Sequence, residues 1–476
     1  MGIGRRIGDS LRLPGRGARR IVVVLVVLAV AGGAGGAVAL AGPGLVERWG
    51  LVAPAPAPLP PVPAPALRPL PPDAPIPTPE GLAAVLDEPA VEMPGKFAGV
   101  VLDAATGREL WGHTPERPLV PASTAKLITA AAALLALNPT DRLITRVVTG
   151  PDPSTVVLVG GGDPTLTALP DPEDSLYPGA PSVQQLADAV REKAPGPIRK
   201  VLVDTSRYTD DDGGLAPGWD RADIAGGFIT PIEPVMLDGG RIDPELQDGP
   251  RVSDPALTAA RAFADALGVD DVEKGTAPPG ATSIAAVGSA PISELAEHAL
   301  RTSDNVLAEV LAREVAIARE AEPSFAGAAE SVLATLRQAG IDTTGAELVD
   351  GSGLSTRNRV PPRLLGEVLA AAAAPAKGPL DAQFLRPVLS GLPVAGGVGT
   401  LDDRYALDGE AAAGRGVVRA KTGSLSGVSS LAGVVTDSDG RLLVFALMSN
   451  GASPAVVRPL HDAMAADLSR CGCRSA

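Results

Sequence analysis

A serine and a lysine stand three residues apart at the start of an alanine-rich stretch, at positions Ser123 and Lys126. On a helix, side chains three positions apart lie on the same face, so the amine of Lys126 can reach the hydroxyl of Ser123. A neutral amine at that distance takes the proton of the hydroxyl and turns the serine into a nucleophile. The pair therefore predicts covalent catalysis by Ser123, with Lys126 as its general base.

Two further motifs lie downstream, and both carry residue types that a serine hydrolase needs. Their members are Ser303, Asp304 and Asn305 in the first motif, and Lys421, Thr422 and Gly423 in the second. In this order, S-x-x-K, S-D-N and K-T-G form the known signature of class A β-lactamases and penicillin-binding proteins. S-x-x-K alone is a weak signal, but only seven lysines occur in the chain and two of them occupy motif positions, which argues against a chance match.

The middle motif is expected to supply groups for proton transfer and orientation. Ser303 would relay a proton to the leaving amine, and Asn305 would bond the substrate backbone or orient Lys126. Because residues two apart in a loop can project into one cleft, Asp304 between them should point elsewhere and have a structural role. The plainer alternative is that Ser303 or Asp304 only caps the helical segment that follows.

The last motif is expected to hold the substrate. Lys421 and Thr422 would bind a substrate carboxylate, and Gly423 would let an edge strand lie close to the ligand. The backbone N–H groups of Ser123 and Ser424 would form an oxyanion hole, because a helix N-terminus favours a developing negative charge.

A base must be neutral, whereas a free lysine with a pKa of about 10.4 is mostly charged at neutral pH. Burial and a neighbouring cation both lower the pKa of an amine. We expect Lys126 to be buried and Lys421 to be the neighbouring cation.

Neither the histidines nor the cysteines offer a rival active centre. His113, His298 and His461 are scattered without the spacing of zinc ligands, so we expect no metal and no cofactor. Cys471 and Cys473 have no partner histidine nearby and are separated by one residue. A disulfide between them would be tight, so a free or intermolecular pair is an equal interpretation.

Charge and patterning at the N-terminus indicate where the protein works. The net charge of −14 and the isoelectric point near 4.8 argue against a nucleic-acid partner. Residues 1–20 are rich in arginine and are expected to stay in the cytoplasm, while the apolar run 21–41 is long enough to cross a bilayer. We favour a retained membrane anchor over a cleaved signal peptide. A proline-rich linker at 42–80 follows, so the folded part is expected in the cell envelope.

Hydrophobic patterning predicts an α+β fold. Residues 97–113 are typical of a β-hairpin and 122–137 of a buried helix that begins at the catalytic serine. Near the C-terminus we expect strands at 417–421, 429–435 and 442–447 and a final helix at 454–468. These outer segments would form an antiparallel sheet with helices on its faces.

The spacing of the motifs indicates an inserted domain. Between Lys126 and Ser303 lie 176 residues, far more than a direct connection needs. With 476 residues, 45% of them hydrophobic, the chain is long enough for two folded domains. We expect the catalytic domain at 81–144 and 271–470 and the insert at 145–270. The insert should contain strands at 155–159 and 200–203 and a helix at 183–193.

Other segments match a known family beyond the three motifs. They are GGGDPTL at 160–166, Ala308-Glu309 after S-D-N, DGSGLS at 350–355 and GTL at 399–401. With them the chain resembles the class C low-molecular-mass penicillin-binding proteins, the D-alanyl-D-alanine carboxypeptidase/endopeptidase family. The resemblance implies a transpeptidase-like domain with an insertion, which acts on peptidoglycan stem peptides and is acylated by β-lactam antibiotics. The family's functional positions match Ser123, Lys126, Ser303, Asn305, Lys421 and Thr422.

Two other functions compete with this interpretation. A class A-like β-lactamase shares the three motifs, but no Glu-x-x-x-Asn deacylation segment follows Ser303, and the long insertion has no place there. A wall-binding scaffold with a decayed site is the second alternative, and the intact motif residues argue against it. The residues alone do not decide between trimming of terminal D-alanine and cleavage of cross-links.

Overall fold

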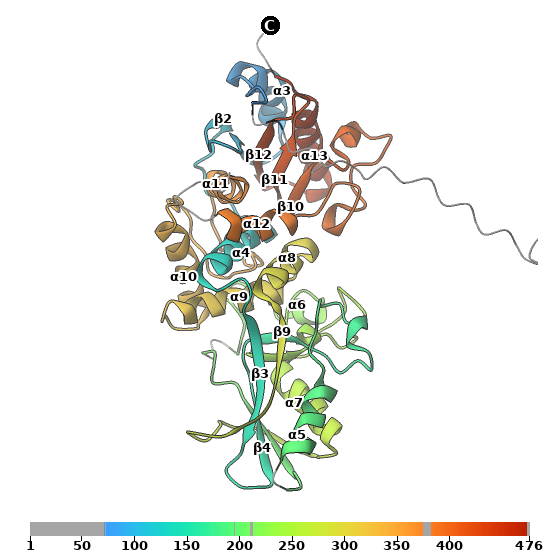
Figure 1. Cartoon of the computed structure of the whole chain (residues 1–476). Coiled ribbons are helices and arrows are strands. Elements are labelled where there is room, and N and C mark those ends of the chain that lie inside the picture. Colours follow the sequence, from blue (N-terminus) through green and yellow to red (C-terminus); the bar gives the residue numbers. More distant parts are fainter. Residues whose placement is uncertain (1–70, 72, 195, 210–212, 375–381, 474–476) are drawn as a thin grey trace, which may run out of the picture. The chain divides into compact units, whose positions relative to one another are not determined.

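The computed structural model describes residues 71, 73–194, 196–209, 213–374 and 382–473. The unit Leu70–Ala476 is compact and contains two five-stranded sheets (Figure 1). The predicted cytoplasmic N-terminus, the anchor or signal peptide and most of the proline-rich linker lie outside the described residues. Within the ranges given above, no helix has both the length and the apolar character needed to cross a membrane.

The first sheet is antiparallel and joins the N-terminal and C-terminal parts of the unit. Its strands, in order across the sheet, are β10 (Arg419–Leu425), β11 (Val428–Thr436), β12 (Leu442–Asn450), β1 (Lys96–Asp103) and β2 (Glu109–His113). The predicted hairpin at 97–113 and the three predicted C-terminal strands are therefore confirmed. β10 stands at an edge of this sheet; the N–H of Ala420 on its outer side donates to the carbonyl of Pro393, and the strand beyond Ala420 is where a ligand could pair.

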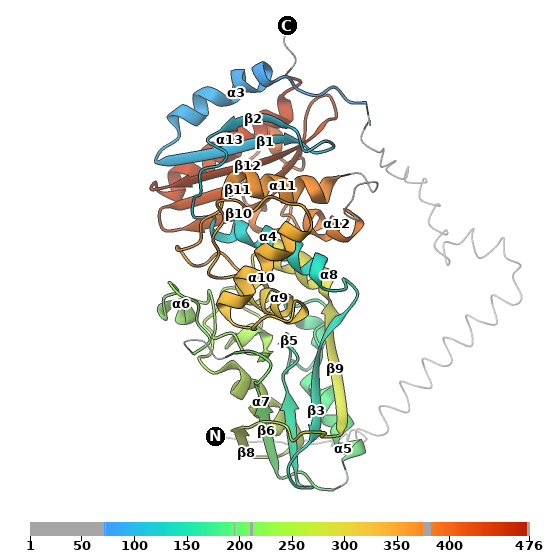
Figure 2. The ribbon, with the colours of Figure 1, turned by 90° about the vertical axis from the view of Figure 1, so that its left-hand side faces the viewer.

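Helices cover both faces of the first sheet, as predicted for the α+β class (Figure 2). They are α3 (Pro79–Glu92) and α13 (Pro454–Arg470) on one face, and α11 (Pro362–Ala373) backed by α4 (Ala125–Ala136) on the other. Side chains of a strand alternate between faces. In β1, Phe97 and Val101 therefore belong to the core under α3 and α13, and Val100 and Leu102 to the core under α11 and α4.

A layer of helices packs against α4 on the side away from the sheet. Its members are α8 (Ile292–Thr302), α9 (Asn305–Ala318), α10 (Phe325–Gln338) and α12 (Ala382–Ser390). Helix α9 is buried along almost its whole length. It therefore offers fixed positions for side chains at either of its ends.

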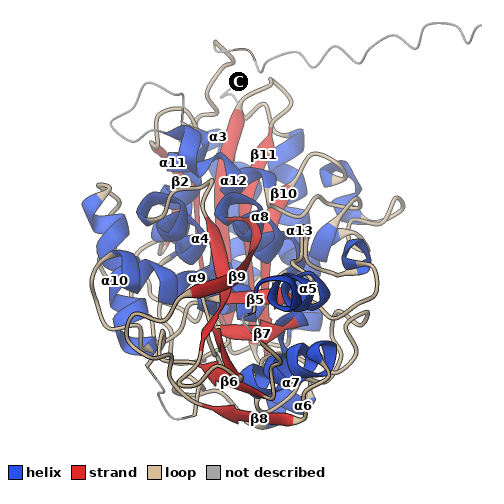
Figure 3. Cartoon of the chain, turned by 60° about the horizontal axis from the view of Figure 1, so that its bottom comes forward, coloured by secondary structure: helices blue, strands red, loops and turns tan. Residues whose placement is uncertain are grey.

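The second sheet is mixed and lies between α4 and α8 in the chain. Its strands, in order, are β8 (Asp271–Lys274), β6 (Lys200–Asp204), β4 (Thr155–Val159), β3 (Arg142–Thr149) and β9 (Ser283–Pro291). Helices α5 (Val183–Lys193) and α7 (Pro255–Leu267) pack against it (Figure 3). The strands predicted at 155–159 and 200–203 and the helix at 183–193 are present.

Short elements complete the fold. They are the strand pair β5 (Asp163–Leu166) and β7 (Val235–Leu237), the helix α6 (Ala222–Ala225), and the 3-10 turns η1 (Ala122–Thr124), η2 (Pro172–Asp174), η3 (Asp238–Gly240), η4 (Gly399–Leu401) and η5 (Glu410–Gly414). After α13 the structure pairs Cys471 with Cys473 as a disulfide, with Cα atoms 4.8 Å apart.

Candidate active site

The serine and the lysine of the first motif lie side by side, but the local structure differs from one continuous helix. Ser123 belongs to the 3-10 turn η1, and α4 begins only at Ala125. Ala122, the residue before the serine, has a φ of 48°, which a non-glycine residue rarely adopts. Lys126 Nζ lies 3.0 Å from Ser123 Oγ. The tight turn thus presents the hydroxyl to an amine on the first turn of the helix.

The amine of Lys126 is buried and has two further neighbours, both of which accept hydrogen bonds. It donates to Asn305 Oδ1 at 2.6 Å and to the carbonyl oxygen of Ser352 at 2.8 Å. A neutral amine has two N–H groups and one lone pair. When both N–H groups bond these acceptors, the lone pair is left for the proton of Ser123. The geometry therefore suits a lysine that acts as a base.

Burial sets the charge state of this amine. Removal from water lowers the pKa of Lys126 to about 8, against the opposing charges of Asp350, Glu309 and Asp304. Burial, followed by repulsion from Lys126, holds the pKa of Lys421 well below its ordinary value. We expected Lys421 to lower the pKa of Lys126, but burial is what lowers it, and the repulsion between the two lysines acts on the pKa of Lys421.

The S-D-N motif joins the end of α8 to the start of α9. Ser303 ends α8 in the left-handed conformation, with a φ of 62°. Asp304 caps α9 by accepting from the N–H of Leu307 at 2.9 Å, and Asn305 is the first residue of that helix. Ser303 and Asn305 therefore face the site while Asp304 is buried behind them, in the structural role expected for it.

The K-T-G motif occupies the edge strand β10. The buried Lys421 donates to Ser303 Oγ at 2.9 Å and to the carbonyl of Thr422 at 2.8 Å. A Cβ at Gly423 would overlap Ser430 Oγ and the carbonyl of Pro121, so only glycine lets the strand lie this close to the turn before the serine.

The remaining substrate-binding positions are less buried. The hydroxyls of Thr422 and Thr400 are 2.7 Å apart, which ties the strand to η4. Arg458 Nε donates to Ser424 Oγ at 3.1 Å. All eight predicted site residues therefore gather around the start of α4, the start of α9 and the end of β10.

A buried carboxylate to which the sequence pattern assigned no role, that of Glu309, supports this arrangement. Both oxygens of Glu309 accept backbone N–H groups, from Gly351 at 2.9 Å and from Ser352 at 2.7 Å. This contact turns the carbonyl of Ser352 toward Lys126. Burial, followed by the charge of Asp350, raises the pKa of Glu309 to about 7. A glutamate one turn after Asn305, in the apolar first half of the helix, was the available signal.

Comparison with known proteins decides the family. The family model described as D-Ala-D-Ala carboxypeptidase 3 (S13) matches residues 79–251 and 245–471. The chain belongs to this family. It is 48% identical over 407 residues to Carboxypeptidase DacB of Mycolicibacterium smegmatis, covering 84% of this chain and 86% of that protein. It is 31% identical to D-alanyl-D-alanine carboxypeptidase of Actinomadura sp., covering 82% of this chain and 84% of that protein.

A solved structure shares the fold of this S13 protein. Penicillin binding protein 4 (dacB) from Haemophilus influenzae superimposes with a TM-score of 0.65 and 22% identity, over 81% of this chain and 99% of that chain. The resemblance inferred from the sequence is thus confirmed, and so is the class of enzyme, a serine-type D-Ala-D-Ala carboxypeptidase.

The rate of acylation of this S13 protein should depend on the protonation state of Lys126. The base is active only when neutral, so the second-order rate constant for acylation by a penicillin should rise about tenfold per pH unit from pH 5 to pH 7 and level off above about pH 9. Stopped-flow kinetics across this range would measure it. Lys126→Arg, which stays charged, should not be acylated at any pH. A flat profile in the parent protein would contradict the assignment of the base.

Glu309 should matter for the rate although it does not touch Ser123. Glu309→Gln keeps the size of the side chain but turns an N–H group toward a backbone N–H, so the 350–355 loop loses a hydrogen bond to a charged acceptor. We expect acylation to slow by about tenfold or more, since such bonds contribute about 1.5–3 kcal/mol. Glu330→Gln, on the exposed side of α10, is the matched control and should react like the parent protein. Equal rates for both variants would show that Glu309 has no such role.

Proposed function

We propose that this protein is an exported serine D,D-peptidase that cleaves D-alanyl-D-alanine-type bonds in peptidoglycan stem peptides through an acyl-enzyme on Ser123. The observation that carries the proposal is the buried amine of Lys126, held between Ser123 Oγ, Asn305 Oδ1 and the Ser352 carbonyl. The two relatives described above are both named as carboxypeptidases, which supports the substrate class.

The first half of the reaction forms the acyl-enzyme. Neutral Lys126 takes the proton of Ser123, and Oγ attacks the carbonyl of the penultimate D-alanine. The negative oxygen of the tetrahedral intermediate would be bound by the N–H groups of Ser123 and Ser424, each worth about 3 kcal/mol in comparable sites. When the peptide bond breaks, protonated Lys126 gives its proton to the leaving amine through Ser303, whose hydroxyl accepts from Lys421, so Lys126 is neutral again.

The second half releases the shortened peptide. Water attacks the ester, and Lys126, now without the serine hydroxyl, takes a proton from that water. The proton then returns to Ser123 Oγ as the ester breaks. At the end of the cycle Ser123 again carries its proton and Lys126 is again neutral.

Binding of the substrate is assigned to the edge strand. The buried amine of Lys421 and the hydroxyl of Thr422 would bind the carboxylate of the terminal D-alanine, and the peptide would pair with β10 beyond Gly423. The hydroxyl contact between Thr422 and Thr400 would keep the threonine in place. An exposed edge strand accepts either a short stem peptide or a cross-linked one, so carboxypeptidase and endopeptidase activity are both compatible with this site.

β-Lactams are proposed as acylating inhibitors because they present an amide carbonyl and a carboxylate in the arrangement of the substrate. The Haemophilus influenzae protein has been solved in complex with a β-lactam. A β-lactamase function is disfavoured, since membership of the S13 family and the second sheet both set this chain apart from that class.

The domain division and the location remain proposals. Because β3 and β9 lie in one sheet, the inserted domain would comprise about residues 142–291, slightly longer than the predicted 145–270. The substrate is a component of the cell wall, which agrees with an exported catalytic domain. The arginine-rich residues 1–20 and the apolar run 21–41 would provide the membrane anchor or the signal peptide.

A fluorescent penicillin tests the proposed function directly. The protein comprising residues 71–476 should give a stable labelled band, and Ser123→Ala should give none. Rapid loss of the label with hydrolysed drug would indicate a β-lactamase instead. No label on a folded parent protein would rule out the acyl-enzyme. Mass spectrometry of digests of pentapeptides and cross-linked muropeptides would then separate carboxypeptidase from endopeptidase activity.

A further inference from the structure

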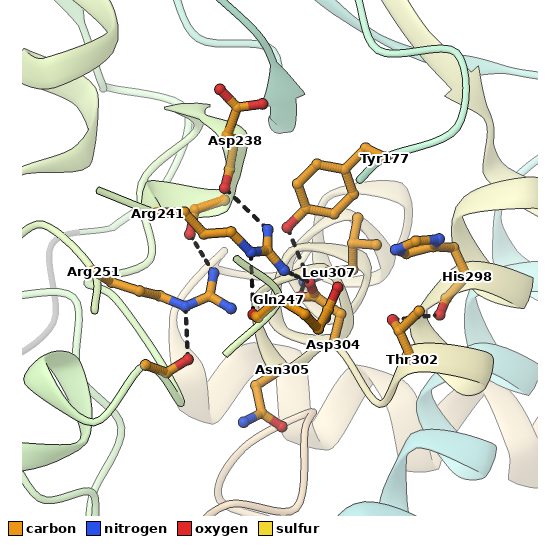
Figure 4. Close-up of polar contacts among 12 residues, drawn as sticks. Tyr177, Asp238, Arg241, Gln247, Arg251, His298, Thr302, Asp304, Asn305 and Leu307 are labelled. Atoms are coloured by element: carbon orange, nitrogen blue, oxygen red, sulfur yellow. Dashed lines mark hydrogen bonds and ion pairs between the residues drawn. The ribbon is translucent and has the colours of Figure 1, made fainter. Parts of the chain in front are cut away.

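The aspartate at the centre of the S-D-N motif is held by the inserted segment (Figure 4). Tyr177 Oη donates to Asp304 Oδ2 at 2.9 Å, and Arg241 Nη2 lies 3.1 Å from the same oxygen. The side chains of Asp304 and Arg241 are both fully buried, with 0% exposure. The guanidinium of Arg241 also lies 5.0 Å above the ring of Tyr177. A buried carboxylate with such partners has a fixed position.

Two arginines tie this contact to the backbone of the insert. Arg241 donates to the carbonyls of Asp238 at 3.0 Å and Gln247 at 3.2 Å. Arg251 donates to the carbonyls of Gly227 at 3.0 Å and Gly239 at 2.5 Å. Burial alone would raise the pKa of Asp304, but the two arginines outweigh it and hold that pKa well below its ordinary range.

A second contact reaches the catalytic asparagine itself. Asn305 Nδ2 donates to the carbonyl of Phe228 at 2.8 Å. A backbone carbonyl can only accept, so the amide nitrogen must face Phe228 and Oδ1 must face Lys126. Arg251 holds the neighbouring carbonyl of Gly227 and thereby the loop that carries Phe228.

This orientation decides where the lone pair of Lys126 points. With Oδ1 as an acceptor, one N–H of the amine is directed at Asn305, another at the Ser352 carbonyl, and the lone pair at Ser123. If the carboxamide turned over, its N–H group would attract the lone pair away from Ser123. Ser303 also depends on this support, because its φ of 62° persists only where the surroundings hold it.

We infer that the inserted segment positions the S-D-N motif for catalysis, with Tyr177, Arg241 and Arg251 as positioning residues that orient the Asn305 carboxamide and thereby the Lys126 lone pair. The inference rests on the proposed function for its effect on the reaction. It also assigns a role to the insert, which supplies Tyr177, Arg241, Arg251 and the carbonyl of Phe228.

The chain contains a natural control for a purely structural role. At the other end of α9, Glu314 is bound by the same residue types from the insert: Tyr208 Oη donates to it at 2.8 Å and Arg207 Nε at 2.9 Å. This second cluster joins the same helix to the same segment, but it lies more than two turns away from Asn305. Tyr208→Phe and Tyr177→Phe therefore remove matched hydroxyl groups.

The test compares these two variants and Arg241→Lys with the parent protein. Acylation by a penicillin would be followed as a function of pH, after thermal unfolding has established that each variant is folded. Tyr177→Phe should slow acylation about tenfold at the plateau, the effect expected from one hydrogen bond to a charged group. Arg241→Lys should slow it further, because a compact ammonium lacks the planar fork of donors with which Arg241 reaches Asp304 and two separate carbonyls. Tyr208→Phe should react like the parent protein.

The pH profile separates positioning from simple destabilisation. A disturbed carboxamide withdraws an acceptor from the Lys126 ammonium, so the pKa of Lys126 should fall and the rising limb should move to lower pH in Tyr177→Phe. A protein that is only less stable would give a scaled curve with an unmoved midpoint. The groups that face Lys126, namely Asp304, Glu309, Asp350 and Lys421, are unchanged in this variant. His298 also faces Asp304, and burial lowers its pKa.

A second measurement keeps this inference separate from the proposed function. In protein with ¹³C-labelled lysine, the signal of Lys126 can be assigned by its absence in Lys126→Arg, and its titration gives the pKa without any substrate. A lowered pKa in Tyr177→Phe and an unchanged one in Tyr208→Phe would support the positioning role even if no penicillin reacted. Parent-like pKa and parent-like acylation in Tyr177→Phe would overturn it.

Discussion

The site depends on one buried amine with fixed hydrogen-bond acceptors. Lys126 has 1% of its surface exposed, so water cannot replace a missing partner. Asn305 and the Ser352 carbonyl therefore do two things at once. They satisfy the N–H groups of the amine, and they direct its remaining lone pair to Ser123.

The surrounding carboxylates oppose the effect of burial on the pKa of Lys126. Burial favours the neutral form, whereas Asp304, Glu309 and Asp350 favour the ammonium, and the net result is a pKa of about 8 for Lys126. A fully desolvated lysine without those carboxylates would lose its proton more easily but would be a weaker base. The carboxylates thus keep the amine basic enough to take a proton from serine, while burial keeps a useful fraction of it neutral.

Helix α9 packs on the helices of the catalytic domain and binds the insert near both of its ends. Its N-terminus carries Asn305, and Asp304 precedes it, bound by Tyr177 and Arg241. Its second half carries Glu314, bound by Tyr208 and Arg207. Glu309, between them, holds the loop that faces Lys126. Because α9 is buried, these contacts fix the relative positions of the motif, the loop and the insert.

Much of the fold and of the candidate site could be predicted from the sequence, because hydrophobic periodicity and short motifs are local features of the chain. The strands of the first sheet, α13 and the identity of the catalytic motifs follow from hydrophobic alternation, from helix-forming residues and from the spacing of Ser123 and Lys126. The start of the serine helix was placed three residues too early, since the 3-10 turn around Ser123 is imposed by the packing of Gly423 against Pro121. Local helix propensity cannot predict a contact between residues so far apart in the chain.

The tertiary structure alone decided which residues support the motifs. Tyr177 and Arg241 are separated from Asp304 by 127 and 63 residues, and Ser352 from Lys126 by 226. No periodicity or short motif links residues at such distances, because their contact exists only after the two sheets and α9 have packed together. The sequence by itself determined the chemistry, since residue type sets what a side chain can donate, accept or attack. The fold determined how these groups are oriented and charged. Long-range hydrogen bonds orient the Asn305 carboxamide, and burial lowers the pKa of Lys126.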